Sequence, residues 1–563
     1  MDLPFNFKFG GGFKTLQNLQ NLDVSGITGY CDVKYLSQNF FNNIHYLKRI
    51  DLSNCKIFKV DEGPFIILRH LENLDISHNE ELGFVSLPNV TYGLKETSIR
   101  TFRADAIRCL IGIGTELTVS HIANLRQTKL IELSFAHNRI ELIGKGVFPN
   151  MPKSLERLSF ALNRLTTGIY LFEFHTLHNL KELNMTFLLK QPKYFSFIFE
   201  KCNENKELKS QESMSARNSK PYFEFRRSSN ITVYMPPKLE TFNANSSKLY
   251  GRIPKLRISA NNLKNLYAQN NLLFSWNQPL FGFERLERVD LSNNFCSSIS
   301  PAFTASGKRL KYMSLARNML ARSIQLDFRC QIFKNQLQLE VLDLSSNKLS
   351  HLPDCIFQSL AKLKVLKLNH NQLSDVNFRI KHMINLFSID FSDNRITTFS
   401  VQTMDSLSYI FSRTKVSIRL LNNKLHCTCK NLDFLKWMLR NKDYFLHVER
   451  YFCSDVNTRF DFNEFEQSLH RLRIDCLDLQ IWITISSIII TFVVCFFVAQ
   501  VIRTNIWYIR YFLYKHKRKN ACDIARKDGA EISGLVLKSD GIDEFSYDSA
   551  EGNSCIMLST FTA

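Results

Sequence analysis

The chain lacks the residue groupings on which catalysis usually depends. No nucleophile paired with a base, no cluster of metal ligands and no phosphate-binding glycine loop stands out from the sequence. We therefore expect neither an enzyme nor a bound cofactor. Acidic residues are also scarce, since 52 Asp and Glu stand against 72 Lys and Arg, a formal charge of +20. That balance is compatible with acidic ligands such as nucleic acid or anionic lipid, and also with a solvated basic glycoprotein.

Long apolar runs are almost absent as well. Residues 481–502 form the one uncharged stretch of this length, IWITISSIIITFVVCFFVAQVI, and as a helix it would cross the roughly 30 Å hydrocarbon core of a membrane. Acidic Asp475 and Asp478 precede it, whereas a basic and aromatic stretch follows it. Because positive charge favours the cytoplasmic side, the pattern predicts a single-pass protein. Its N-terminal part would be extracellular or lumenal, and its C-terminus cytoplasmic.

Both ends of the sequence lack features that such a protein would need. The first residues, MDLPFNFKFGGG, show neither the charged nor the apolar region of a signal peptide. Residues 503–563 read as a basic juxtamembrane segment followed by a disordered tail, because the last 44 residues are too few and too polar to form a core. The sequence therefore predicts a truncated form of a longer receptor.

What the sequence does contain is a repeat. LEVLDLSSNKL, LKVLKLNHNQL and LFSIDFSDNRI follow one another, and their asparagines Asn347, Asn371 and Asn394 are 24 and 23 residues apart. This is the pattern of a leucine-rich repeat, with 20–29 residues per turn. It predicts an α/β solenoid, a horseshoe whose parallel sheet lines the concave face. Solenoids of this kind usually bind ligands over that long surface.

We place about fifteen repeats in residues 1–425, with an irregular insert at 191–238. Three weaker repeats replace the asparagine by Cys55, Ile107 or Ser247. The amide at the end of each strand can satisfy backbone groups that the turn leaves unpaired. The predicted asparagine ladder consists of Asn138, Asn163, Asn271, Asn294, Asn318, Asn347, Asn371, Asn394 and Asn423.

Within one repeat, residues two apart on the strand share a face. Leu342 and Leu344 should therefore both point into the core, and Asp343 should point to solvent. A phenylalanine recurs nine or ten residues after the asparagine, which predicts an aromatic spine on the far side of the core. Its members are Phe148, Phe281, Phe303 and Phe357.

Fourteen cysteines indicate an oxidising compartment. Cys427, Cys429, Cys453 and Cys476 follow the last repeat, so residues 426–477 are predicted to be a disulfide-bonded cap over the open end of the solenoid. Four cysteines allow three pairings, and geometry disfavours a bond between Cys427 and Cys429. A zinc site is the alternative.

Cys330 and Cys355 occupy nearly equivalent places on adjacent repeats, 17 and 16 residues before the next ladder asparagine. They form either a disulfide bridge between repeats or two buried free thiols. N-x-S/T sequons at Asn89, Asn184, Asn230 and Asn245 are candidates for glycosylation.

The order of repeats, C-x-C…C…C cap, single span and the stretch NIWYIRYFLYKHKRK resembles the Toll-like receptors over about residues 19–519. The resemblance implies cap disulfides Cys427–Cys453 and Cys429–Cys476. It also implies recognition of a microbial or damage-associated ligand at the cell surface or in endosomes, the ligand being a protein, a lipid or a nucleic acid. Receptors of this family form homo- or heterodimers and signal in innate immunity through a cytoplasmic TIR domain.

This sequence departs from the family at that last point, because no match to a TIR domain follows the span. We therefore expect a chain that binds without signalling alone. The alternative function is that of a leucine-rich repeat adhesion or growth-control protein of the cell surface, binding another protein.

Overall fold

The computed structural model describes residues 7–108, 115–165, 169–186, 231–247, 250–252, 256–279, 282–454 and 460–527. The chain divides into two compact units, residues 1–470 and 471–563. The first contains the repeats and the second contains an apolar helix. Phe281, Asn230 and the tail beyond residue 527 are sequence predictions that lie outside the described residues.

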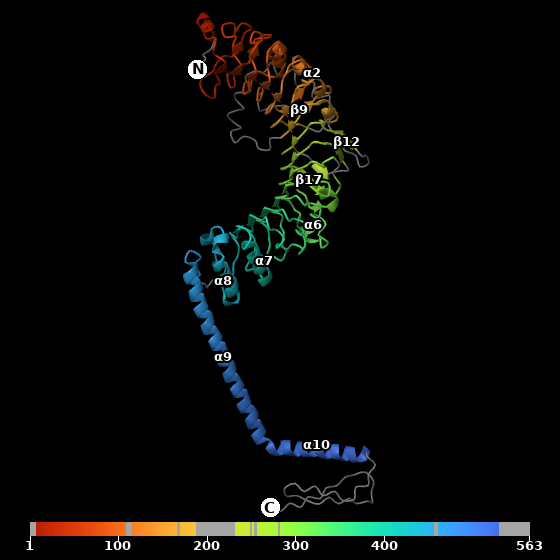
Figure 1. Cartoon of the computed structure of the whole chain (residues 1–563), viewed down its shortest axis with the longest axis vertical. Helices are drawn as coiled ribbons and strands as arrows, with labels where there is room; N and C mark the ends of the chain where they lie inside the picture. Colours follow the sequence, from red (N-terminus) through yellow and green to blue (C-terminus); the bar gives the residue numbers. More distant parts are fainter. Residues whose placement is uncertain are drawn as a thin grey trace, which may run out of the picture. The chain divides into compact units, whose positions relative to one another are not determined.

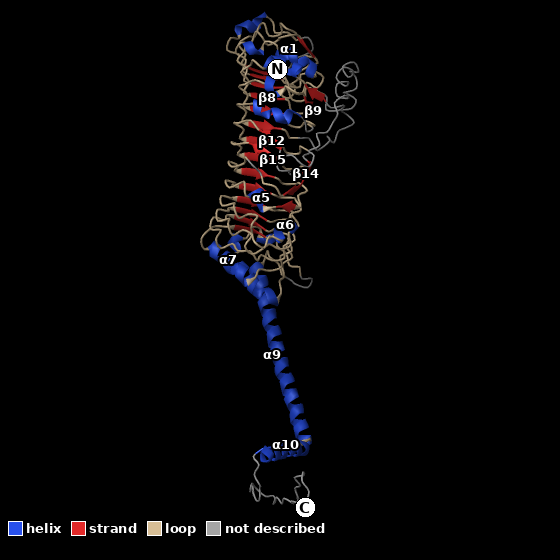
Figure 2. Ribbon diagram, turned by 90° about the vertical axis from the view of Figure 1, so that its right-hand side faces the viewer, coloured by secondary structure: helices blue, strands red, loops and turns tan. Residues whose placement is uncertain are grey.

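The repeats form one parallel sheet of fifteen strands, each inner strand having one neighbour on either side (Figures 1 and 2). The fold therefore is the predicted leucine-rich repeat solenoid. In order across the sheet the strands are β1 (Asn21–Asp23), β3 (Arg49–Asp51), β5 (Asn73–Asp75), β6 (Thr101–Arg103), β8 (Glu132–Ser134), β10 (Arg157–Ser159), β11 (Glu182–Asn184), β13 (Thr241–Asn243), β16 (Asn265–Tyr267), β18 (Arg288–Asp290), β20 (Tyr312–Ser314), β21 (Val341–Asp343), β22 (Val365–Lys367), β23 (Ser388–Asp390) and β24 (Ser417–Arg419).

The register of this sheet follows the repeat. Each strand is three residues long, and its middle residue is the second leucine of the LxxLxL pattern, or its replacement. Leu342, for example, pairs with Met313 on one side and Leu366 on the other. Because all of these middle residues point inward, any slip by one residue would turn the apolar row to solvent.

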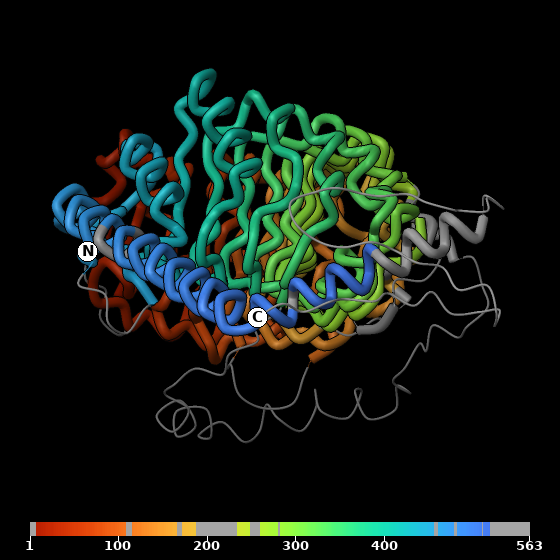
Figure 3. Tube along the Cα trace, turned by 90° about the horizontal axis from the view of Figure 1, so that it is seen from below, coloured from red at the N-terminus to blue at the C-terminus, as the bar shows by residue number. Residues whose placement is uncertain are grey.

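Shorter sheets and helices complete the turns away from the main sheet. Figure 3 shows the successive coils of the repeats as a tube coloured along the sequence. The smaller sheets pair β2 (Tyr35–Leu36) with β4 (Lys59–Val60), β7 (Thr115–Leu117) with β9 (Ile140–Ile143), β12 (Ile231–Tyr234) with β15 (Leu256–Ser259), and β14 (Tyr250–Arg252) with β17 (Leu272–Trp276) and β19 (Ser298–Ile299). The described α-helices that lie wholly in the first unit are α1 (Leu87–Thr91), α2 (Val119–Ile122), α5 (Pro301–Thr304), α6 (Ala321–Gln325), α7 (Val401–Phe411) and α8 (Leu432–Arg440). Short 3-10 turns are η1 (Gly11–Thr15), η2 (Phe84–Ser86), η3 (Leu94–Glu96), η4 (Ala123–Leu125), η5 (Phe148–Asn150), η6 (Ile169–Thr176), η7 (Cys429–Asn431), η8 (Lys442–Tyr444) and η9 (Val448–Arg450).

Aromatic rings fill the core behind the sheet. Phe148, Phe303 and Phe357 are all buried, as the repeat pattern predicts. Phe357 lies between Phe333 and Phe378, with ring centroids 6.2 and 5.1 Å away. Contacts at this spacing extend the apolar core from one repeat to the next.

The first repeat is covered at its open side by an aromatic group that the sequence analysis did not anticipate. Phe9 is buried and its ring lies 5.5 Å from that of Phe40 and 6.3 Å from that of Phe41. At the other end of the solenoid, α8 packs the ring of Trp437 against Phe411 at 5.8 Å. Both ends of the repeat core are thus shielded by side chains from outside the repeat pattern.

The predicted insert extends too far toward the C-terminus. Residues 187–230 lie outside the described residues, but β12 pairs in register with β15, and Met235 is buried. The sequence ITVY consists of β-branched and aromatic side chains, which favours a strand. The last residues of 191–238 therefore belong to the solenoid.

The second unit is dominated by the helices α9 (Phe465–Thr504) and α10 (Ile506–Lys527). Among the described residues, α9 is the helix long and apolar enough to cross a membrane, and it contains the predicted span 481–502. It starts at Phe465, so the end of the predicted cap is already helical. Residues 520–527, which were expected to begin a disordered tail, continue α10. Since no glycine or proline occurs between 506 and 527, nothing in that segment stops the helix.

Candidate functional site

The asparagine ladder fixes the turn that comes after each strand of the sheet. The side-chain amide of Asn371 donates to three backbone carbonyls at 2.9, 3.1 and 3.3 Å. Its Oδ1 accepts from the backbone N–H groups of Asn347 and Leu349 in the preceding repeat, at 2.9 and 3.0 Å. The residue before the asparagine has a positive φ, 55° at His370. Each asparagine thus connects two repeats through buried polar groups.

The nine predicted ladder asparagines are all buried, with at most 7% of their surface exposed. Asn79, which is not among the predicted ladder residues, is also fully buried and accepts from the N–H groups of Cys55 and Ile57. Its repeat, LENLDISHN, matches the pattern and could have been found. At a position without asparagine, the Ser247 hydroxyl donates to the Met185 carbonyl at 2.7 Å.

Several turns are also capped from the open face of the sheet. Asp51 Oδ1 accepts from the N–H of Ser53 at 2.8 Å, and Asp343 Oδ1 accepts from the N–H and hydroxyl of Ser345 at 3.0 and 2.6 Å. Asp343 is consequently only 9% exposed, so the expectation that it points freely to solvent is wrong. The acidic residue is held by the local turn, as an Asx cap.

Near the N-terminal end of the face, three charges meet on adjacent strands. Glu132 forms ion pairs with Arg103 at 2.8 Å and with Arg157 at 3.1 Å. Partial burial works to raise the pKa of the Glu132 carboxyl, but hydrogen bonds from the two guanidinium groups outweigh it and leave the pKa below its usual value. Glu132 is therefore an ionised carboxylate, and the two arginines balance its negative charge.

A more buried acid lies beside this group. Burial raises the pKa of Asp105 above its usual value, although it accepts hydrogen bonds from Ser134 Oγ and the N–H of Ala136.

The histidines in the turns differ from one another. His78 and His370 are exposed, whereas His137 is partly buried and burial lowers its pKa. His137 is therefore not simply a solvent-exposed residue of its turn, because part of its side chain is packed against the protein.

One flank of the sheet carries alternating charges. From Glu156 to Lys364, the residue after the first leucine of the repeat is alternately Glu and Lys, and each Glu pairs with the Lys of the next repeat. The four pairs are Glu156–Lys181 at 2.8 Å, Glu240–Lys264 at 3.1 Å, Glu287–Lys311 at 2.9 Å and Glu340–Lys364 at 2.8 Å. Each exposed pair stabilises little, but together they leave this flank nearly neutral.

The opposite flank has an apolar stripe. Leu272, Phe295 and Met319 each follow the ladder asparagine on three successive repeats, and they are 41%, 54% and 40% exposed. In other repeats the same position holds charged residues such as Arg164 and Lys348. Three exposed apolar side chains in register mark this stripe as a candidate contact for another macromolecule.

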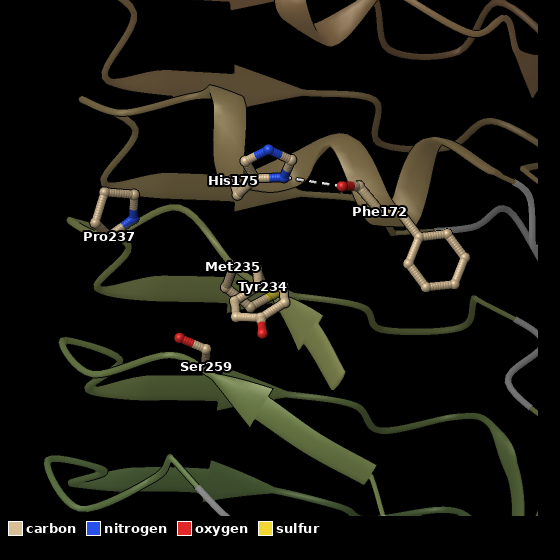
Figure 4. A pocket seen from close by; sticks show the side chains of 6 residues that line it. All are labelled: Phe172, His175, Tyr234, Met235, Pro237 and Ser259. Atoms are coloured by element: carbon tan, nitrogen blue, oxygen red, sulfur yellow. Dashed lines mark hydrogen bonds between the residues drawn. The ribbon is translucent and has the colours of Figure 1, made fainter. Parts of the chain in front are cut away.

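A cavity of about 620 Å³ opens beside η6, β12 and β15. Its lining residues are Phe172, His175, Tyr234, Met235, Pro237 and Ser259 (Figure 4). His175 Nδ1 lies 2.9 Å from the Phe172 carbonyl, and among the described residues no acidic or cationic side chain beyond this imidazole lines the space. The cavity can hold an apolar group, and its described lining has no pair of groups suited to proton transfer.

The structure joins several cysteines. Cys330 and Cys355 are bonded with their Cα atoms 5.7 Å apart, as are Cys427 and Cys453. Cys429 and Cys476 are each engaged in a disulfide bond. A further bridge, Cys31–Cys55, was not predicted; its two cysteines are 24 residues apart and occupy different positions of adjacent repeats. Among the described residues, Cys296 and Cys495 are free, and no group of three or more His, Cys, Asp or Glu could hold a metal ion.

Three of the four sequons are described. Asn89 is in α1, Asn184 ends β11, and Asn245 is in the turn after β13. Asn89 is exposed as a residue, whereas Asn184 and Asn245 are half-buried. Their amide nitrogens differ in another way, since only that of Asn89 donates a hydrogen bond within the described part of the chain.

Comparison with known proteins identifies the repeats. Residues 337–379 match the family model described as leucine rich repeat. The chain is 31% identical over 551 residues to Toll-like receptor 4 of Pinctada imbricata, covering 90% of this chain and 60% of that protein. The repeat region belongs to the Toll-like receptor family. The chain is also 23% identical to Toll-like receptor 4 of Bos taurus, covering 78% of this chain and 55% of that one.

The chain spans about 60% or less of the length of those two Toll-like receptors. Its fold is similar to that of the leucine-rich repeat protein LIC12759 of Leptospira interrogans, with a TM-score of 0.50, 19% identity and coverage of 78% of this chain and 93% of that one. The Toll-like relatives are leucine-rich repeat receptors and not enzymes.

Proposed function

We propose that this chain is a single-pass membrane receptor of innate immunity that binds its ligand through the leucine-rich repeats. The observation that carries the proposal is the fifteen-stranded sheet, whose face bears different polar side chains on a regular scaffold. A rigid scaffold with varied surface residues suits recognition. The absence of a proton-transfer pair from the described cavity is consistent with a binding role.

The orientation follows from the charges around α9. Asp475 lies before the apolar run, whereas Arg503, Arg510 and Lys515 come after it. Within the span, Ile485 and Phe492 are exposed, as lipid-facing side chains should be. The proposed topology has the repeats extracellular or lumenal and the C-terminus in the cytoplasm.

The apolar stripe supports a protein partner. Leu272, Phe295 and Met319 would be costly to leave in water, and a second copy of the chain or a related receptor could cover them. We propose that the receptor forms a homo- or heterodimer through this flank. The stripe favours a protein contact there over a polyanion.

The decisive test is a measurement of the chain's orientation in the membrane. An epitope tag placed after Ala563 should be stained only after the plasma membrane is permeabilised, whereas a tag inserted before Phe7 should be stained on intact cells or be protected inside vesicles. A control chain with Arg503, Arg510, Lys515, Lys517, Arg518 and Lys519 all changed to Gln should lose most of the orientation bias. A C-terminal tag accessible on intact cells would reject the proposed receptor topology.

A further inference from the structure

Within the described part of the chain, the amide nitrogens of the two sequons at the sheet donate no hydrogen bond. Asn184 Oδ1 accepts from the N–H and the hydroxyl of Thr186, at 3.1 and 2.7 Å. Asn245 Oδ1 accepts from Ser246 Oγ at 3.0 Å and from Asn270 Nδ2 at 2.9 Å. Among the described residues, neither Asn184 Nδ2 nor Asn245 Nδ2 donates a hydrogen bond. The nitrogen that would carry a glycan is thus available in both.

Asn89 is different, although it is exposed as a residue. Its Nδ2 donates to the buried Val60 carbonyl of the preceding repeat at 3.0 Å. The sequon hydroxyl of Thr91 is completely buried and donates to the Leu87 carbonyl at 2.7 Å. A glycan on Asn89 would be attached to a nitrogen that faces the boundary between two packed repeats, so the folded solenoid disfavours it.

Asn184 and Asn245 are 61 residues apart in the sequence but neighbours on the sheet. Asn184 pairs in register with Asn243 on the adjacent strand, and Asn245 lies two residues farther along. Parallel strands are about 4.8 Å apart and rise about 3.3 Å per residue, so the two Cα atoms are roughly 8 Å apart. Groups attached to them would occupy one area of the face, next to Tyr267 on β16.

We propose that Asn184 and Asn245 carry N-linked glycans, that Asn89 does not, and that the two glycans cover the sheet face over β11, β13 and β16. This inference rests on the proposed extracellular or lumenal orientation of the repeats. It divides the face into two open sections, β1 to β10 and β18 to β24. Ligand contact on the sheet is then confined to those sections and to the flanks.

The first test is site-specific occupancy. The full chain, produced behind a secretory signal sequence in animal cells, is treated with peptide N-glycosidase in heavy-oxygen water and mapped by mass spectrometry. We expect the label at Asn184 and Asn245 and none at Asn89. Label at Asn89, or none at Asn184 and Asn245 while Asn230 is labelled, overturns the inference but leaves the topology intact. No label at any of the four sites overturns both.

The second test concerns coverage of the face. Glu182 is exposed and lies two residues before Asn184 on the same side of β11, and Lys367 is exposed in the open section on β22. The variants Glu182→Cys and Lys367→Cys are labelled with a large polyethylene glycol maleimide, and the background of the parent chain is subtracted. Deglycosylation should speed labelling of Glu182→Cys several-fold and leave Lys367→Cys unchanged. Equal rates before and after treatment at Glu182→Cys would show that the glycans do not cover the strand.

Discussion

The ladder asparagine Asn371 offers the sharpest test of how the repeats are held together. In Asn371→Ala, five hydrogen bonds to the backbone disappear at once. The carbonyls are little affected, because each retains another donor: Leu344 from Asn347, Leu368 from Asn394, and Asn369 from Ser346. The two N–H groups of Asn347 and Leu349 lose their acceptor in a buried site.

A buried donor without a partner costs about 1–3 kcal/mol, so two of them should destabilise the solenoid by roughly 2–6 kcal/mol. The small cavity left by the amide adds to this cost. Loss of a single exposed hydrogen bond would instead cost no more than about 1 kcal/mol. The expected loss of stability is therefore large enough to distinguish two buried donors without an acceptor from the loss of one exposed hydrogen bond.

The matched control is Asn369→Ala, the same substitution two residues earlier. The Asn369 side chain is half-exposed and donates no hydrogen bond within the described part of the chain. Urea unfolding followed by circular dichroism should show a much lower midpoint for Asn371→Ala and almost no shift for Asn369→Ala. Hydrogen exchange should rise first at the amides of Asn347 and Leu349. Equal midpoints for the two variants would refute the ladder as a source of stability.

Two further outcomes can be tested from the geometry. Because the Cα atoms of Cys330 and Cys355 are 5.7 Å apart, non-reducing peptide mapping should recover them as one cross-linked pair, and alkylation of either thiol in the folded protein would contradict the bridge. Changing Leu272, Phe295 and Met319 together to Ser should lower the co-purification of differently tagged copies several-fold. The substitutions Lys348→Ser and Arg395→Ser at the same repeat position should leave this co-purification unchanged. Unchanged recovery of the triple variant would exclude the stripe as the dimer contact.

Much of the fold was predictable because the repeat encodes its own geometry. The spacing of Leu342, Leu344 and Asn347 fixes a strand, its inward face and the turn after it, and the same pattern recurs along the chain. Asn79 obeys this pattern and was missed only because its repeat was not recognised. Cys31 was harder to find, since it does not occupy the asparagine position that its partner Cys55 occupies.

Other features depend on packing between repeats and could not be predicted locally. Asp343 belongs to an outward-facing position, yet the cap on Ser345 buries it. The available nitrogen of Asn245 depends on Asn270 in the next repeat. The limits of α9 and α10 also differ from the predicted ones, since hydropathy marks the apolar span but not the helical residues on either side of it.

The net charge of +20 is compatible with an acidic ligand and also with a solvated basic glycoprotein, and the described sheet face favours the second interpretation. Arg103 and Arg157 share Glu132, and Lys367 lies 3.6 Å from Asp343. A polyanion placed on these strands would have to compete with carboxylates that already hold the basic groups. On these strands, the carboxylates therefore offset the binding free energy that a polyanion would gain from the positive net charge. If the face binds the proposed ligand, we expect recognition there to depend more on hydrogen-bond geometry and shape than on charge, with the net charge acting mainly through long-range attraction.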